Sequence, residues 1–296
     1  MAASSARRDR ALLLAGPALL VIVVFMLLPM AIAAVYSFLT PDPYGGVLHP
    51  FTPASYVRFV YDRDLDDQLI FDTTYLQIFA RSVVQALFCT LFCLLIGLPL
   101  AWYMATRPPR LRQVLVLLVT IPFWTNLLIR TYCWVLLLRD QGLVNQVLQA
   151  LGLIKEPITF LYSDGAVQLG LVYSSLPFMV LPIYGALEKV DPRMVEAAYD
   201  LYADRWAIMR RLVWPLAWPG VVAGCLLVFV PALGAFLSPD ILGGGKKLMI
   251  GSLIQQQFTT GRDWSFGAAL SMILMIFVLG ALMWSAWRRT RIGVAT

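Results

Sequence analysis

The chain has 296 residues, of which 60% are hydrophobic and 14% are charged, and its mean hydropathy is +0.75. Soluble globular proteins carry about 45–50% apolar and about 25% charged residues, so this composition excludes that class and predicts an integral membrane protein. No basic helix interleaved with base-stacking aromatic residues accompanies the net charge of +6. The charge therefore favours anionic lipid headgroups over nucleic acid as a partner.

Six long uncharged runs follow one another along the chain. A helix needs about 20 mainly apolar residues to cross the hydrocarbon core of a bilayer. The third run reaches this length if it continues past Arg130 toward Leu138. The sequence thus predicts an all-α integral membrane protein with a six-helix transmembrane bundle at residues 11–287. The expected spans are residues 11–38, 76–106, 112–138, 165–187, 212–237 and 265–287, between tails at 1–10 and 288–296.

The first run follows a short basic tail with Arg7, Arg8 and Arg10. A basic leader before an apolar stretch is also typical of a cleaved signal peptide, and Ala31-Ile32-Ala33 would then be the small-residue cleavage site. The apolar stretch is longer than the usual signal-peptide core of about 7–15 residues. An uncleaved first span is therefore favoured, with the signal peptide as the alternative.

Lys and Arg residues gather in both tails, in the turn after the second span and in the loop 188–211, while Asp62, Asp64, Asp66 and Asp67 lie in the first loop on the other side. By the positive-inside rule, both termini and the loop 188–211 are predicted to be cytoplasmic. The acidic cluster is either a docking point for an external delivery protein or ordinary solvated surface.

Residues that could act in catalysis or bind a metal, such as His and Cys, are scarce. Cys89, Cys93, Cys133 and Cys225 all fall inside predicted spans, with no histidine near them to complete a metal site, so we expect small buried hydrophobic residues. The single histidine, His49, lies in an external loop. We therefore predict no catalytic residue and no metal ligand in this chain.

Two outer segments have a local interpretation. Apolar residues recur at helical spacing from Gln141 to Gly152, which predicts a short amphipathic helix on the outer surface. The run Gly243 to Lys247 resembles a phosphate-binding loop, but Asp240 and Lys247 occupy the positions where that motif needs a glycine and a Ser or Thr. The sequence therefore predicts no nucleotide site in this chain.

The loop 188–211 contains a predicted short helix. Asp191 is suited to the N-cap and Pro192 to the first helical position. Val195, Tyr199 and Tyr202 recur on one face, so the segment could lay an apolar face into the groove of a partner.

In this loop, Glu196-Ala197-Ala198, three residues, Tyr202, nine residues and Leu212-Val213-Trp214-Pro215 follow one another. This pattern resembles the cytoplasmic signature of ABC importer permeases, which is Glu-Ala-Ala, three residues, Gly, nine residues and Ile-x-Leu-Pro. The resemblance implies that the loop docks on an ATP-binding subunit through a coupling helix. The coupling residues it implies are Glu196, Ala197, Ala198, Asp200, Leu201, Tyr202 and Ala203.

Tyr202 stands where the signature has glycine. Either the helix continues through Tyr202, or the turn there adopts the positive φ that glycine permits, at a cost of about 1 kcal/mol or more. The first choice for a contact with the partner is Glu196, which can accept charge-assisted hydrogen bonds.

Three further segments, residues 121–130, 242–251 and 262–269, look like the first of the two permease subunits of spermidine/putrescine importers. The resemblance implies a type I ABC importer permease in the bacterial inner membrane. Its implied partners are a second permease, two ATP-binding subunits that bind ATP and Mg, an external solute-binding protein and membrane lipid, with no cofactor in this chain. The alternatives are a permease for phosphonate, sulfate or ferric iron, and an ion-coupled secondary transporter, which would carry acidic residues within its spans.

A polyamine cation would need carboxylates or aromatic faces along its path. Asp240, Tyr132, Trp134 and Tyr173 are the candidates, although aromatic residues at span ends also anchor helices at the interface and Asp240 could pair with Lys246 or Lys247. Arg130 would repel such a cargo. We expect it to pair with an acid or a carbonyl, or to extend toward the membrane surface.

Overall fold

The computed structural model describes residues 16–17, 20–42, 45–63 and 69–293. The chain divides into two compact units, residues 1–76 with 254–296 and residues 77–253, which are described separately. The predicted tail 1–10 and the acidic residues Asp64, Asp66 and Asp67 lie outside the described residues.

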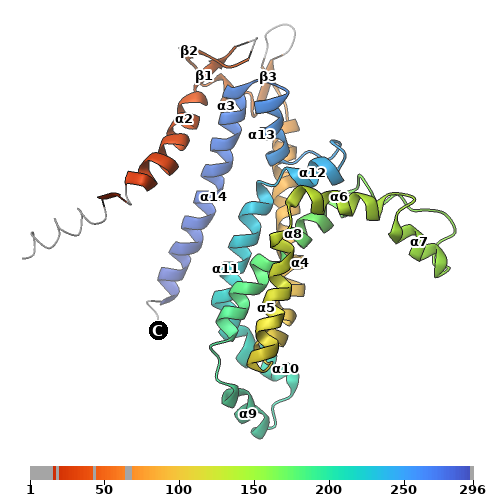
Figure 1. The fold of residues 1–296 in the computed structure, drawn as a ribbon. Coiled ribbons are helices and arrows are strands. Elements are labelled where there is room, and N and C mark those ends of the chain that lie inside the picture. Colours follow the sequence, from red (N-terminus) through yellow and green to blue (C-terminus); the bar gives the residue numbers. More distant parts are fainter. Residues whose placement is uncertain (1–15, 18–19, 43–44, 64–68, 294–296) are drawn as a thin grey trace, which may run out of the picture. The chain divides into compact units, whose positions relative to one another are not determined.

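The first unit contains two small antiparallel sheets besides its helices (Figure 1). Its long helix α14 (Trp264–Gly293) packs against α2, α3 and β1. The hydroxyls of Ser55 and Ser265 are 2.8 Å apart in a buried hydrogen bond, and Nη1 of Arg58 is 2.7 Å from Oδ2 of Asp263. These contacts attach the segment around α3 to the start of α14. The other elements are η1 (Val23–Leu27), α2 (Leu28–Tyr36), β1 (Leu39–Pro41), β2 (Val47–Phe51), α3 (Ala54–Val57), β3 (Tyr61–Arg63) and β4 (Leu69–Phe71).

Two helices continue from one unit into the other: α4 (Thr74–Ala105) begins in the first unit and α13 (Ile250–Thr259) ends in it. The start of α4 is stabilised by Asp72, whose Oδ1 accepts hydrogen bonds from the hydroxyl and the backbone N–H of Thr74 at 2.7 and 2.9 Å. These hydrogen bonds hold the pKa of Asp72 below its usual value, because they favour its charged form.

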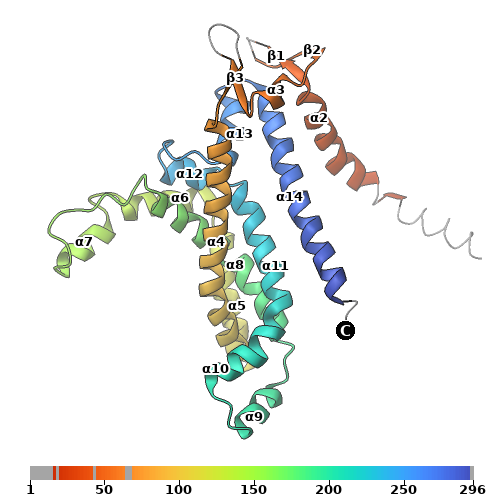
Figure 2. The same ribbon diagram turned by 180° about the vertical axis from the view of Figure 1, so that it is seen from behind.

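The second unit is helical throughout its described elements (Figure 2). Its two most closely packed helices are α8 and α11. The remaining elements that lie wholly in it are short or broken helices. The bounds are α5 (Pro109–Trp124), α6 (Leu127–Leu138), α7 (Leu143–Ala150), α8 (Asp164–Leu187), α9 (Pro192–Asp200), α10 (Arg205–Ile208), η2 (Met209–Val213), α11 (Trp214–Leu233) and α12 (Leu237–Leu242).

Glycines allow the close contact between α8 and α11. A Cβ added to Gly220 would lie 2.5 Å from the carbonyl oxygen of Pro182, and one added to Gly224 would lie 2.8 Å from Sδ of Met179. Small residues let helix backbones approach in this way in membrane proteins, where packing rather than water exclusion holds helices together.

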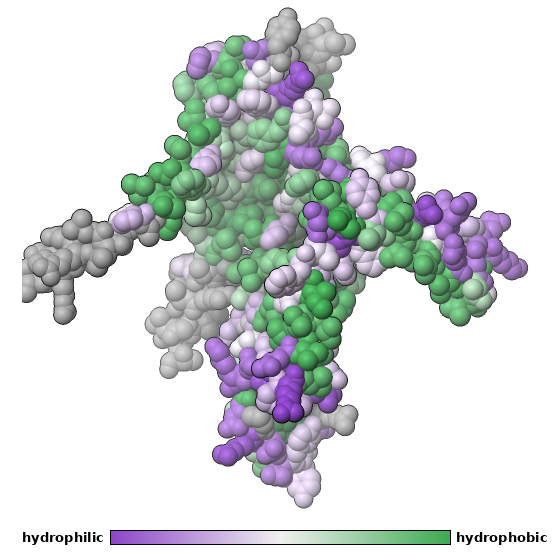
Figure 3. All heavy atoms as spheres, viewed as in Figure 1, coloured by the Kyte–Doolittle hydropathy of each residue, from purple (hydrophilic) through white to green (hydrophobic). Residues whose placement is uncertain are grey.

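The described residues contain four helices that are long and apolar enough to cross a membrane, or five if one bent pair counts as a span. A shorter apolar helix covers Leu20–Tyr36. Large apolar side chains are exposed over these helices. Figure 3 shows hydrophobic surface over α5 and hydrophilic surface at the end of the second unit that carries α9 and α10. This distribution is the one expected of helices that face lipid.

The segment predicted as one span at 112–138 is not a single helix. It consists of α5 and α6, and the helical stretch that begins with α6, Leu127–Ala150, is bent by 91° relative to α5 at Thr125–Asn126. The side chain of Asn126 accepts a hydrogen bond from the N–H of Leu128 at 2.8 Å and so caps a new helix, while Thr125 has an extended backbone. A capping residue in the middle of an apolar run thus starts a second helix in a new direction.

Candidate functional site: the loop after α8 and a cavity between broken helices

Helix α9 opens the loop 188–211. The side chain of Asp191 accepts a hydrogen bond from the N–H of Arg193 at 3.0 Å, and Pro192 occupies the first helical position. Both features satisfy or remove N–H groups that a helix start leaves without partners. The helix is therefore fixed at its first turn by its own sequence.

The helix does not continue through Tyr202. Tyr202 has a φ of +58°, its N–H donates to the carbonyl of Tyr199 at 2.9 Å, and the N–H of Ala203 donates to the carbonyl of Ala198 at 3.0 Å. This pair of hydrogen bonds is the Schellman motif, which usually has glycine at the position with positive φ. Tyr202 thus adopts the turn that glycine would make, and its side chain is 98% exposed.

This turn divides the apolar face predicted from Val195, Tyr199 and Tyr202. Val195 and Tyr199 line a cavity of about 510 Å³ between α9 and the α4–α5 turn, whereas Tyr202 lines a different cavity of about 540 Å³ beside α10. The prediction of one continuous face is wrong, because the helix ends at Asp200 and Tyr202 belongs to the turn that follows it. The first of these cavities is also lined by Glu196.

Two arginines of the chain share that first cavity with Glu196, namely Arg107 and Arg112. Nη1 of Arg112 is 3.2 Å from Oε1 of Glu188, and its Nη2 donates to the carbonyl of Ala105 at 2.8 Å. Arg112 therefore joins the end of α4, the start of α5 and the residue after α8. Sequence reasoning missed this residue, because the contact connects segments that are far apart in the chain.

None of the four residues predicted for the solute path lines the two cavities beside the loop 188–211. The rings of Trp134 and Tyr173 meet edge to face with centroids 5.4 Å apart, while Tyr132 is 57% exposed on α6. Asp240 lies in α12. Lys247 pairs not with Asp240 but with Asp164, at 3.3 Å.

Asp164 also forms an ion pair with Arg81 of α4, so the first residue of α8 binds two cationic side chains.

The glycines before Lys247 have a structural explanation. Gly244 and Gly245 have φ values of +61° and +70°, and a Cβ on Gly244 would overlap the ring of Tyr162.

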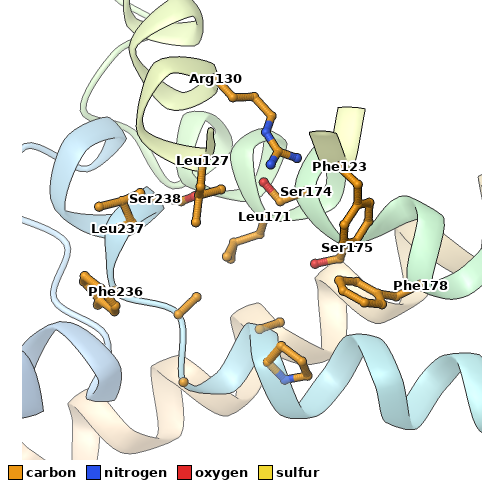
Figure 4. A pocket seen from close by; sticks show the side chains of 14 residues that line it. Phe123, Leu127, Arg130, Leu171, Ser174, Ser175, Phe178, Phe236, Leu237 and Ser238 are labelled. Atoms are coloured by element: carbon orange, nitrogen blue, oxygen red, sulfur yellow. The ribbon is translucent and has the colours of Figure 1, made fainter. Parts of the chain in front are cut away.

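Another cavity, of about 290 Å³, lies between α6, α8 and the connection from α11 to α12 (Figure 4). None of the four predicted path residues lines it. Its polar groups come from Arg130, Ser174, Ser175 and Ser238, and its other described lining residues are mainly apolar. Two helix breaks, at Thr125–Asn126 and Gly234–Phe236, adjoin it, and such breaks in transporters mark binding sites.

Comparison with known proteins identifies the family. The family model of the "Binding-protein-dependent transport system inner membrane component" matches residues 97–287. The chain is 42% identical over 271 residues to the "Spermidine/putrescine transport system permease protein PotB" of Escherichia coli (strain K12), covering 92% of this chain and 94% of that protein.

Two solved structures share the fold. A bacterial ABC transporter involved in the import of the acidic polysaccharide alginate has a chain that superposes with a TM-score of 0.71 at 17% identity, covering 98% of both chains. A structure of the alginate transporter in complex with a pentasaccharide-bound periplasmic protein gives a TM-score of 0.68 at 16% identity, covering 98% of this chain and 97% of that chain. The predicted helical fold of an ABC importer permease is confirmed, and the chain belongs to the family of inner membrane components of binding-protein-dependent transport systems.

Proposed function

We propose that this permease imports a polyamine of the spermidine/putrescine class across the bacterial inner membrane, with a second permease subunit. The observation that supports this cargo is the 42% identity over 92% of the chain to a spermidine/putrescine permease. The external binding protein would deliver the solute. Both termini and the loop 188–211 would face the cytoplasm, since the basic residues gather there.

The loop after α8 is the proposed contact with an ATP-binding subunit. Its most exposed large apolar residues are Leu201, Tyr202 and Trp206, with exposed fractions of 81%, 98% and 72%. Apolar side chains that cluster on a polar end of a molecule mark an interaction surface. The partner subunits, not this chain, would bind ATP and Mg.

The Glu-Ala-Ala helix supplies the polar part of this contact. Glu196 is exposed on α9, and Ala197 and Ala198 keep the neighbouring surface small, so that a partner backbone can approach. Asp200 and Ala203 flank the turn at Tyr202 and would complete the interface. A carboxylate at such an interface accepts charge-assisted hydrogen bonds from cationic or N–H donors.

Transport by this arrangement is alternating access. ATP shifts the permease between outward-facing and inward-facing states only if the closed ATPase dimer binds one of these states better than the other. The loop 188–211 would couple the closure of the ATPase dimer to a movement of α8 and α11, the helices before and after it. Asp240, Tyr132, Trp134 and Tyr173 remain our candidates for contacts with the solute.

Uptake of radiolabelled spermidine tests the cargo. Cells that lack other polyamine importers would express this chain with its partner subunits and the binding protein. We expect ATP-dependent spermidine uptake that competing putrescine reduces. Uptake that persists after ATP depletion and stops when the proton gradient is dissipated would contradict the proposal, as would a binding protein stabilised by sulfate or phosphonate instead of spermidine.

Co-purification tests the contact with the ATP-binding subunit. Glu196→Lys should reduce the amount of ATP-binding subunit recovered with the permease at least tenfold, because it reverses the charge at the docking surface. The matched control is Glu156→Lys, which changes an acid that is also exposed, in the α7–α8 loop, and should leave recovery unchanged. Equal recovery from both variants would exclude Glu196 from the contact.

A further inference from the structure

Arg130 lies beside the 290 Å³ cavity with an incomplete set of partners. Its Nη2 donates to the carbonyl of Thr125 at 3.3 Å, and its guanidinium carbon is 5.8 Å from the centroid of the Tyr173 ring. Its Nε is buried and has no hydrogen-bond partner. Among the described residues, no Asp or Glu forms an ion pair with Arg130. A ligand in the cavity cannot reach this buried Nε, but Nη1 is accessible and forms no hydrogen bond with the described residues, so it can donate to a ligand.

The surroundings of Arg130 in the cavity are neutral. Figure 4 shows the guanidinium turned toward the hydroxyl of Ser174, with Ser175 and Ser238 farther along the wall. The described lining includes no carboxylate and no second cation. The cavity therefore has a net positive charge, and three hydroxyl groups can act as further donors.

The start of α6 adds to this positive potential. Leu127, the first residue of α6, lines the cavity, so the N-terminal end of the helix dipole lies next to it. This contribution depends on the 91° bend, because a straight helix from 109 to 138 would have no free N-terminus here. A helix N-terminus and an unpaired arginine both favour a negatively charged ligand.

We propose that this cavity binds a small anion of the carboxylate class, with Arg130 as its cationic partner and the serine hydroxyls as additional donors. A carboxylate accepts two hydrogen bonds from a guanidinium and leaves room for hydroxyl donors to the same oxygens. The cavity has a volume of about 290 Å³, several times the volume of about 30 Å³ that one water molecule occupies in the liquid, so a small anion fits in it. A polyamine cation would be repelled here, so this site is separate from the cargo site and does not depend on the proposed cargo.

Binding of ¹³C-labelled formate tests the proposal. The purified complex that contains this chain would be titrated with formate at constant ionic strength, in a buffer with no other carboxylate or halide, and the formate line width measured by NMR. We expect saturable broadening with the wild-type complex and at least tenfold weaker binding with Arg130→Gln. Arg139→Gln, which removes an exposed arginine at the other end of α6, should bind formate like the wild type.

Two milder variants cover the case in which Arg130→Gln does not fold. Arg130→Lys keeps the charge but loses the planar pair of donors, and Ser174→Ala removes one hydroxyl, so each should weaken formate binding about threefold to tenfold. The proposal is overturned if wild type gives no saturable broadening, if these variants bind like the wild type, or if spermidine displaces formate competitively. Spermidine uptake by the same variants is measured separately, so failure of the anion site does not decide the cargo.

Discussion

Tyr202 makes the turn that glycine makes in the family signature, and it adds a side chain at that position. Its backbone makes a turn with a φ of +58°, which is unfavourable for a residue with a Cβ, while its ring stands 98% exposed on the proposed docking surface. The side chain thus offers contact area at the expense of local stability.

Replacing Tyr202 should show these contributions separately. Tyr202→Gly removes the unfavourable φ, so we expect the turn to be stabilised by about 1 kcal/mol, which corresponds to about fivefold slower hydrogen exchange at the N–H of Ala203. Tyr202→Ala keeps the Cβ and should leave that exchange rate nearly unchanged. Both variants remove the ring and should weaken recovery of the ATP-binding subunit equally. Faster exchange in Tyr202→Gly would contradict this interpretation of the turn.

At the scale of helices, Arg112 connects the α4–α5 turn with the beginning of the loop 188–211. Its guanidinium contacts Glu188 and the carbonyl of Ala105, and its Nε is buried without a partner. Surface ion pairs contribute little to stability, but this one also positions the residue that follows α8. We expect it to matter for the transmission of movement more than for folding.

Charge exchange tests the role of Arg112. Arg112→Glu and Glu188→Arg should each lower spermidine uptake about tenfold while ATP hydrolysis by the complex continues, because the loop would no longer be held against α5. The double variant should recover a large part of the uptake. Arg110→Glu, at an exposed position near Arg112 at the start of α5, is the matched control and should transport normally. A double variant no better than either single variant would show that Arg112 does not act through Glu188.

The helix breaks were the least predictable part of the fold. The apolar run at 112–138 has the length and hydrophobicity of one span, and hydropathy alone cannot distinguish a straight helix from two helices at 91°. Asn126 was the available indication, since a capping residue inside an apolar run favours a new helix start. The small sheets after α2 could not be expected from short segments without a regular alternation of polar and apolar residues.

At the scale of the whole molecule, sequence composition predicted the membrane class and the family signature predicted the permease fold, and both are confirmed. The start of α9 agreed with a local N-cap pattern, because capping depends on neighbouring residues only. The cavity beside Arg130 and the contacts of Arg112 and Asp164 depend on helices that are distant in sequence. A single sequence carries no direct information about such pairs.

The orientation of the chain remains a prediction that labelling can check. After replacement of the native cysteines, Asp200→Cys in α9 and Glu156→Cys in the α7–α8 loop would be treated with a membrane-impermeant maleimide. We expect only Glu156→Cys to react in intact cells with a permeable outer membrane, and both to react after lysis. Labelling of Asp200→Cys before lysis would place the loop 188–211 outside and exclude its contact with a cytoplasmic ATPase.

The contact of Gly220 and Gly224 with α8 has a mechanical meaning for the loop between the two helices. At these two glycines the backbone of α11 lies so close to α8 that no side chain would fit between them. Helices packed this tightly cannot slide past each other without a steric collision. The two helices that enter and leave the loop, α8 and α11, are therefore held together and should move as one unit. A movement of α9 would therefore displace the contacting parts of α8 and α11 together, and the helix breaks at Thr125–Asn126 and Gly234–Phe236 are places where the backbone can bend.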